Sequence, residues 1–201
     1  YQGRWRTPQE IEILESRGRM DLAQKDWLVK LRRWRKDLAT TDKARTAYDQ
    51  IAAIKDPIAI APLATAFRGE GDRRVKMLYA DVLANINTSE AVGVLVERTL
   101  NDADEELYYY CLDKLVQLQP PHVSDGFIAA LKDKSNPRVN RAGAALGRLQ
   151  DKSAISPLID ALITTHTVVL PGRPGAGPNS TSTTFGDGGT VMKQNEGPRV
   201  Q

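Results

Sequence analysis

The sequence predicts an all-α protein: a solenoid of about four stacked helix pairs, with a helical N-terminal cap and an extended C-terminal tail. The main observation is an internal repeat. Residues 54–67 read IKDPIAIAPLATAF, and residues 149–162 read LQDKSAISPLIDAL, so that Asp56 aligns with Asp151. The offset between the two segments divides into three steps of about 32 residues, with two weaker copies between them, and such a period is typical of stacked-repeat proteins.

Residues 1–41 are predicted to form two helices that cap the first repeat, because the end of a solenoid exposes apolar surface unless something covers it. The segment 7–10, TPQE, is typical of a helix start, with a capping hydroxyl, a proline in the first turn and a returning glutamate. The first helix is expected to stop near Gly18, and the second to start at Asp21.

The second of these predicted helices carries a candidate nucleic-acid patch. Trp27 and Trp34 lie seven residues apart and therefore on one helix face. Several cations next to an aromatic side chain could contact phosphates and stack on a base. The interruption of the charge by Asp26 and Asp37 favours the alternative, in which Trp34 packs inward and the cations face solvent. The basic patch comprises Lys30, Arg32, Arg33, Arg35 and Lys36.

Residues 42–166 are predicted to hold four units, each with a helix A, a short turn and a helix B. The A helices are expected at residues 42–53, 72–85, 104–117 and 137–148, and the B helices at residues 57–68, 89–100, 121–132 and 153–164. The equivalent core positions are Leu63, Leu95, Phe127 and Leu158 in helix B, and Val75, Leu107 and Val139 in helix A. Neighbouring units would bury these positions against each other. Replacing Leu158 by Ala is therefore expected to cost about 2–5 kcal/mol of stability.

The turns between the predicted helices carry residues that suit helix ends. Asp56, Thr88 and Asp151 each precede a B helix and could cap it. An acidic group at residues 102–106 falls at the start of an A helix, where the helix dipole favours negative charge. We interpret this group as part of a helix start rather than as a metal site.

The units resemble HEAT repeats of the short bacterial type, which are named after the bilin lyases of the phycobilisome. The resemblance rests on Pro62-Leu63 and Pro157-Leu158 in helix B and on the segment 136–139, NPRV, which opens a helix A. It covers residues 42–164, although the two middle units lack the Pro-Leu pair. It implies a right-handed α-solenoid that binds proteins. The family also includes lyase subunits and, more distantly, DNA-repair glycosylases, but no motif of this chain carries either activity over.

In a HEAT-like stack the B helices line the concave face, which makes this face the expected partner-binding surface. The outward positions of the four predicted B helices contain three carboxylates and no lysine or arginine. A phosphate backbone would be repelled there, whereas a peptide or helix with basic residues could fit. The candidate partner-binding residues on this face are Thr65, Glu97, Asp125 and Asp160.

Aromatic residues of a tyrosine cluster and of the tail are further candidates for partner binding. Tyr108, Tyr109 and Tyr110 point in three directions around one helix, so at least one of them should be exposed. An exposed tyrosine is a common interface anchor, although ordinary partial burial of all three stays open. From this cluster and from the tail we select Tyr108, Tyr109 and Phe185.

Residues 167–201 are predicted to form an extended tail rich in Gly, Pro, Ser and Thr. Residues 168–201 contain 7 Gly and 4 Pro, which excludes helix and is typical of a linker. Residues 183–185 and 190–192 flank a glycine-rich segment and could pair as a β-hairpin. The tail is therefore either a mobile linker or an extended arm that docks on another protein.

Composition and charge limit the possible classes of protein. A hydrophobic content of 41% and a charged content of 26% fit a soluble globular protein, and no apolar run approaches the length that spans a membrane. Residues 1–46 carry 12 Lys and Arg against 7 Asp and Glu, whereas residues 47–164 carry 13 against 16. The repeats are thus mildly acidic, and the basic charge is concentrated before them.

A single cysteine, Cys111, excludes an internal disulfide and a cysteine-based metal cluster, and its apolar context predicts a buried thiol. The chain begins with Tyr1, so we expect a processed protein from which any signal peptide has been removed. Its compartment stays open: a bacterial protein that is either cytoplasmic or exported fits equally well.

No catalytic constellation is recognisable in the sequence, because His122 and His166 do not have the spacing of a metal site or of a nucleophile–base pair. We therefore expect a non-catalytic scaffold or structural subunit of a larger assembly, without cofactor or metal, that binds another protein through its solenoid surface and its tail. Two alternatives stay open. One is nucleic-acid binding through residues 27–36, and the other is a lyase-type chaperone for a chromophore protein, for which the sequence offers Cys111 and scattered tyrosines.

Overall fold

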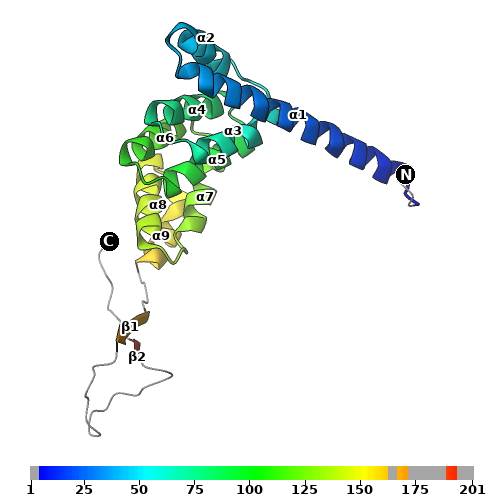
Figure 1. Cartoon of the computed structure of the whole chain (residues 1–201). Coiled ribbons are helices and arrows are strands. Elements are labelled where there is room, and N and C mark those ends of the chain that lie inside the picture. Colours follow the sequence, from blue (N-terminus) through cyan, green and yellow to red (C-terminus); the bar gives the residue numbers. More distant parts are fainter. Residues whose placement is uncertain (1–4, 163–166, 172–188, 194–201) are drawn as a thin grey trace, which may run out of the picture. The chain divides into compact units, whose positions relative to one another are not determined.

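The computed structural model describes residues 5–162, 167–171 and 189–193, with side chains for residues 5–162. The chain divides into two compact units, residues 1–150 and residues 151–201, and each is described by itself. The helices of the first unit are α1 (Pro8–Leu38), α2 (Thr41–Ala52), η1 (Pro57–Ala59), α3 (Ile60–Gly69), α4 (Arg73–Ile86), α5 (Ser89–Asn101), α6 (Glu105–Leu118), α7 (Val123–Ala130) and α8 (Asn136–Leu149) (Figure 1).

The repeats of the first unit form two layers of helices. The A helices α2, α4, α6 and α8 follow one another in one layer, and the B helices α3, α5 and α7 follow one another in the other (Figure 1). Within the layers α4 packs on α6, and α5 packs on α7; between the layers α5 packs on both α4 and α6. This arrangement confirms the predicted helical repeat fold. The right-handed twist of the solenoid stays a prediction.

Three A helices end in the same way. Asn87, Gln119 and Gln150 follow α4, α6 and α8 with positive φ angles of 48°, 41° and 55°. The backbone N–H of each donates a hydrogen bond to the carbonyl four residues earlier. A residue with left-handed backbone angles commonly ends a helix. Here the same kind of helix end recurs at the period of the repeat.

The predicted caps of the B helices are also present. The carboxylate of Asp56 accepts a hydrogen bond of 2.9 Å from the backbone N–H of Ile58. In the second unit, Asp151 accepts one of 2.9 Å from Ser153. Each aspartate opens a short 3-10 turn that continues into a B helix. The sequence match between the two segments is therefore a match of local structure.

The predicted core positions are buried in the first unit. Leu63, Leu95 and Phe127 have no exposed surface. The helix A positions Val75, Leu107 and Val139 are buried as well. Leu158, in contrast, is only half-buried. The cost expected for its replacement by Ala was too high, because that estimate requires a fully buried side chain.

The first helix differs from the prediction. Residues Pro8–Leu38 form one continuous helix, so neither the stop near Gly18 nor the start at Asp21 occurs. The predicted capping box is present: the Thr7 hydroxyl accepts a hydrogen bond from Glu10 N–H, and the Glu10 carboxylate accepts one from Thr7 N–H. A glycine in an exposed helix interior costs only about 1 kcal/mol, and no proline lies between residues 9 and 38 to break the helix.

The second unit contains η2 (Lys152–Ala154), α9 (Ile155–Ala161), β1 (Thr167–Pro171) and β2 (Gly189–Lys193). The two strands pair antiparallel, with Thr167 opposite Lys193 and Pro171 opposite Gly189. Residues 190–192 are thus in a strand, as predicted, and this strand pairs with β1. Residues 183–185, the predicted partner, lie outside the described residues.

None of the described helices combines the length and the apolar character that a membrane-crossing helix needs.

Candidate functional site

The second half of α1 packs against the first repeat through one face. Trp27, Leu31, Trp34 and Leu38 are spaced by three or four residues, which places them on one side of the helix. Leu31 is only 1% exposed, and the rings of Trp27 and Trp34 pack edge to face with centroids 6.3 Å apart. The indole N–H of Trp27 donates a 3.0 Å hydrogen bond to Asp56. The aspartate that caps the first B helix therefore also anchors α1.

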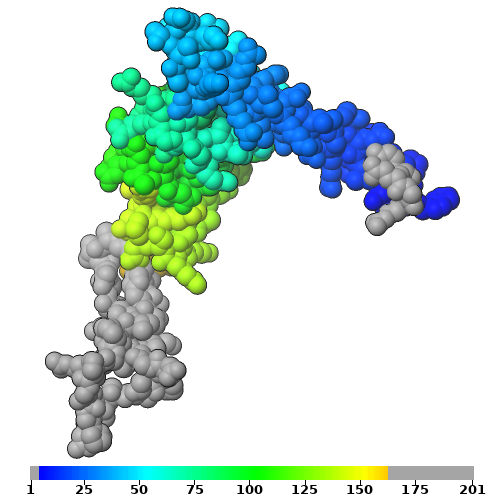
Figure 2. All heavy atoms as spheres, in the orientation of Figure 1, coloured from blue at the N-terminus to red at the C-terminus, as the bar shows by residue number. Residues whose placement is uncertain are grey.

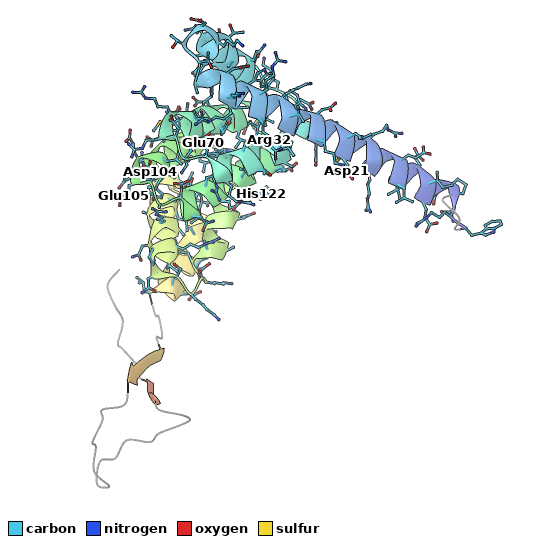
Figure 3. The ribbon with its side chains drawn as sticks, viewed as in Figure 1. Asp21, Arg32, Glu70, Asp104, Glu105 and His122 are labelled. Carbon is cyan, nitrogen blue, oxygen red and sulfur yellow. The ribbon has the colours of Figure 1, made fainter. Side chains whose placement is uncertain are left out.

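A pocket of about 320 Å³ lies beside this contact, between α1, α3 and α4. Figure 3 shows Arg32 and Glu70 in this region, where α1 meets the repeats. The pocket combines apolar walls with a few polar groups, as ligand and peptide sites commonly do. The residues that line it include Leu28, Leu31, Arg32, Arg35, Glu70 and Tyr79.

An ion pair closes one side of the pocket. The Arg35 guanidinium donates two hydrogen bonds, of 2.5 and 3.0 Å, to the two carboxylate oxygens of Glu70. The Glu70 side chain is 8% exposed and also accepts hydrogen bonds of 2.9 Å from the backbone N–H groups of Gly71 and Asp72. A two-pronged pair of this kind fixes orientation as well as charge. It joins α1 to the turn that follows α3.

The pair changes the protonation behaviour of its surroundings. Burial alone would raise the pKa of Glu70, but the hydrogen bonds from Arg35 and from the two backbone N–H groups outweigh burial and hold that pKa below its ordinary value. The hydrogen bond to Glu70 raises the pKa of Arg35. Burial, with a smaller contribution from the charge of Glu70, raises the pKa of the Tyr79 hydroxyl to about 12. Near neutral pH the pair is charged and the tyrosine is neutral.

The five cations of the predicted basic patch do not form one continuous basic surface. Arg35 is held by Glu70, Lys30 lies over the ring of Trp27 at 4.9 Å from its centroid, and Arg33 lies 3.9 Å from Asp37. Arg32 and Lys36 are exposed, and Arg32 lines the pocket. Trp34 is half-buried and its ring packs against that of Trp27, so it is not a free stacking platform.

The outward face of the B helices holds three of the predicted partner-binding residues. Thr65 is exposed on α3 and lines the pocket, and its hydroxyl donates a hydrogen bond of 3.0 Å to the carbonyl of Ala61. Asp125 is exposed on α7, 3.3 Å from the imidazole Nδ1 of His122. Glu97 is half-buried on α5. The three residues lie on successive B helices, as the alignment predicted.

The charge of this face differs from the prediction. Arg98 lies 3.1 Å from the Glu97 carboxylate, and Arg68, on α3, lies 3.6 Å from it. These arginines compensate the negative charge that the sequence assigned to the row. They were missed because Arg68 and Arg98 stand outside the two aligned rows of outward positions. The face is therefore mixed in charge rather than acidic.

Comparison with known protein families gives a match to one family model, described as the PBS lyase HEAT-like repeat, over residues 140–164. This match, over about an eighth of the chain, supports a HEAT-like repeat protein. No curated protein matches the chain significantly in sequence. The matched segment begins within α8 and covers the predicted fourth repeat.

The tyrosines of the HEAT-like repeats have different environments. Tyr108 is buried and its hydroxyl donates to the carbonyl of Arg141, whereas Tyr109 is 53% exposed and packs against Tyr108 with ring centroids 4.9 Å apart. The hydroxyl of Tyr110 donates a 2.8 Å hydrogen bond to Asp81. Tyr109 therefore meets the expectation of one exposed tyrosine, and Tyr108 supports the fold rather than a partner contact.

Two predicted site residues lie in the second part of the chain, residues 151–201. Asp160 is exposed on α9, in the second unit, and Phe185 lies outside the described residues. The acidic group at residues 102–106 starts a helix, as interpreted: the carboxylate of Asp104 accepts hydrogen bonds from the N–H groups of Glu106 and Leu107 at the start of α6. Asp102 is buried and bound by Lys76 at 2.9 Å.

Sequence reasoning missed the pocket and two of its residues, Glu70 and Tyr79. Glu70 stands in a predicted loop, and Tyr79 lies within an A helix, where an aromatic residue is ordinarily part of the core. One signal could have singled out Glu70: it precedes Gly71 and Asp72 and could accept hydrogen bonds from their N–H groups in a tight turn. Its arginine partner, 35 residues away, could not be found in this way.

Proposed function

We propose that this HEAT-like repeat protein is a non-catalytic subunit that holds another protein against the outward face of its B helices. One observation carries the proposal. Along three successive B helices, outward positions such as Thr65 and Asp125 are exposed, while Leu63, Leu95 and Phe127 are fully buried. A row of exposed positions on a rigid stack is the kind of extended surface that repeat proteins use for binding.

The pocket beside α1 extends this proposed surface. It is contiguous with Thr65 and combines the apolar side chains of Leu28 and Leu31 with the exposed Arg32. A partner segment with an apolar side chain next to a carboxylate would fit these groups. Because two arginines lie beside Glu97, this surface does not favour a mainly basic partner.

The chemistry of the described side chains supports a binding role over a lyase role. Cys111 was the nucleophile that a lyase-type chaperone could use. Its side chain has no exposed surface, and burial raises the pKa of its thiol to about 12. In the pocket, Arg35 and Glu70 are bound to each other, and Tyr79 is neutral at physiological pH. None of these groups is poised as a nucleophile or a general base.

The proposal includes a contribution from the tail. The β1–β2 pair is a two-stranded sheet, and such a pair is marginally stable in water without support. A bound partner could supply that support by pairing with a strand edge.

The proposal is tested by affinity capture from the native source with the wild-type chain and two matched variants. Asp125→Arg reverses an exposed charge in the first turn of a B helix, and Glu105→Arg does the same in the first turn of an A helix. We expect the wild type and Glu105→Arg to retain the same partner, and Asp125→Arg to lose most of it. Recovery of the wild-type chain alone, or equal capture by both variants, would contradict the proposal.

A further inference from the structure

The first half of α1 extends beyond the repeats and exposes apolar side chains on two faces. Ile13 and Met20, which are 53% and 50% exposed, continue the face that packs against the repeats further along the helix. Leu22 and, in the second half of the helix, Val29 are both 65% exposed and lie on another face. In the view of Figure 2, the first half of α1, coloured blue, is not covered by the repeats; Asp21 marks it in Figure 3.

The second face forms a regular seam along α1. Its positions are separated alternately by four and three residues, the spacing of a coiled-coil contact. With about 100° of rotation per residue, Val29 points away from Leu31, which is the buried anchor of α1. The seam therefore lies opposite the repeats and is open along its length. It comprises Ile11, Glu15, Gly18, Leu22, Lys25 and Val29.

The two halves of α1 carry opposite charge. Residues 10–21 contain 4 acidic and 2 basic side chains, whereas residues 25–36 contain 6 basic and 1 acidic. An antiparallel pair of these helices would place the acidic half of each beside the basic half of the other. A parallel pair would place like charges together.

We propose that two copies of this chain associate through α1, antiparallel, with Ile11 of each copy opposite Val29 of the other. The same register places Glu15 opposite Lys25 and Gly18 opposite Leu22, so every contact of the seam occurs twice. This contact uses a face of the molecule other than the B-helix surface, and it does not depend on the function proposed above.

The chemistry of each contact supports this register. Ile11 and Val29 are apolar, and Glu15 and Lys25 are oppositely charged; within the described residues neither charge forms an ion pair in the single chain. Gly18 provides room for Leu22 of the second copy, because no heavy atom lies within 4 Å of the position its Cβ would take. The overlap of residues 8–32 corresponds to about 37 Å of paired helix.

Only three apolar side chains per copy lie in the seam, so the pairing is modest in strength and depends on charge. Exposed ion pairs weaken as salt rises, because ions screen them. The association should therefore be strongest at low ionic strength.

The test is sedimentation equilibrium of the full 201-residue chain over a range of concentrations at low ionic strength. We expect a monomer–dimer equilibrium that high salt shifts toward the monomer. Leu22→Lys should leave the chain monomeric, and Met20→Lys, two residues away on another face, should dimerise like the wild type. Both side chains are at least half exposed, so neither variant should impair folding, which circular dichroism would check.

A charge exchange tests the direction of the pairing. Glu15→Lys or Lys25→Glu alone should weaken the dimer by about tenfold, because each places two like-charged pairs in the seam. The double variant Glu15→Lys/Lys25→Glu should restore wild-type affinity. A wild-type chain that stays monomeric throughout, a dimer insensitive to Leu22→Lys, loss of the dimer in Met20→Lys, or no restoration in the double variant would each overturn the proposal.

Discussion

The two halves of α1 have similar sequence patterns and different environments. Ile13, Met20, Trp27 and Trp34 follow one another at intervals of seven residues on one face of the helix. The first two are about half exposed, whereas the last two are partly buried against the repeats, and Trp27 is bonded to Asp56. Side chains at the same periodic positions are thus partly buried in the second half of the helix and exposed in the first.

This difference shows that a segment of the chain can form a helix without being buried. The capping box at Thr7 and Glu10 and the helix-forming residues after it support the first half locally, without tertiary contacts. The second half is supported in addition by Leu31 in the core and by the Arg35–Glu70 pair. Periodicity shows which face of a helix is apolar. Whether that face is covered depends on which other segments of the chain pack against it.

The largest expected effect contrasts two leucines of the same helix. Leu31→Ala removes a side chain that is 1% exposed and should lower the free energy of unfolding by about 2–5 kcal/mol, because it leaves a cavity. Leu22→Ala removes one that is 65% exposed and should change stability by less than about 0.5 kcal/mol. Urea denaturation of both variants, at a concentration where the chain is monomeric, measures the difference. Equal losses would show that the two halves are not distinct in packing.

The ion pair between α1 and the α3–α4 turn is the next largest contribution. Glu70→Ala removes the acceptor of two hydrogen bonds from Arg35 and of two backbone N–H groups. Because Arg35 is 37% exposed, solvent screens part of the interaction, and the expected loss is about 1–2 kcal/mol. Chemical denaturation of Glu70→Ala measures this loss, and Glu105→Ala, at an exposed carboxylate of α6, is the control.

The same pair should make stability depend on pH in the acidic range. The pKa of Glu70 is lower in the folded chain than its ordinary value, so the carboxylate stabilises the folded state fully above the ordinary glutamate pKa. This contribution is lost as the pH falls through the lowered pKa. The difference in unfolding free energy between the wild type and Glu70→Gln should therefore shrink over that range. A difference that stays constant as the pH falls would show that the Glu70 charge is not coupled to folding.

The repeat was predicted well from the sequence, because the same cap and core positions recur in several units and support one another. Asp56 and Asp151 cap equivalent turns, and Leu63, Leu95 and Phe127 are buried as their alignment required. Outside the repeats each inference rested on single residues. Gly18 suits a helix end, but the helix formers around it can offset its cost of about 1 kcal/mol, and the helix continues through it.

The candidate site was predicted only in part, for a different reason. Thr65, Glu97 and Asp125 lie on the expected helices, but the arginines beside Glu97 and the partner of Arg35 depend on contacts between distant segments. Composition and spacing do not encode such contacts. The net charge of a surface can therefore change when side chains from neighbouring helices reach into it.

The hydrogen bond that anchors α1 to the first repeat has a smaller expected effect. Trp27→Phe removes the indole N–H that donates to Asp56 but keeps an aromatic ring at the contact. The loss should be about 0.5–1.5 kcal/mol, the usual net contribution of a hydrogen bond. Thermal denaturation monitored by circular dichroism measures it, with Trp5→Phe, at a fully exposed position, as the control. Similar melting temperatures for Trp27→Phe and the control would show that this anchor is dispensable.

The smallest effect concerns the junction between the two halves. Because Gly18 lies inside one continuous helix, with open space where a Cβ would be, Gly18→Ala should increase helix content and stabilise α1 by about 0.5–1 kcal/mol. If a helix instead ended at this glycine, alanine would remove a favourable stop and leave helix content unchanged or lower. Far-ultraviolet circular dichroism at low protein concentration distinguishes the two results. Gly71→Ala, in the turn between α3 and α4, is the matched control: no atom lies near its Cβ position either, but it should not raise helix content, because it lies outside the helices.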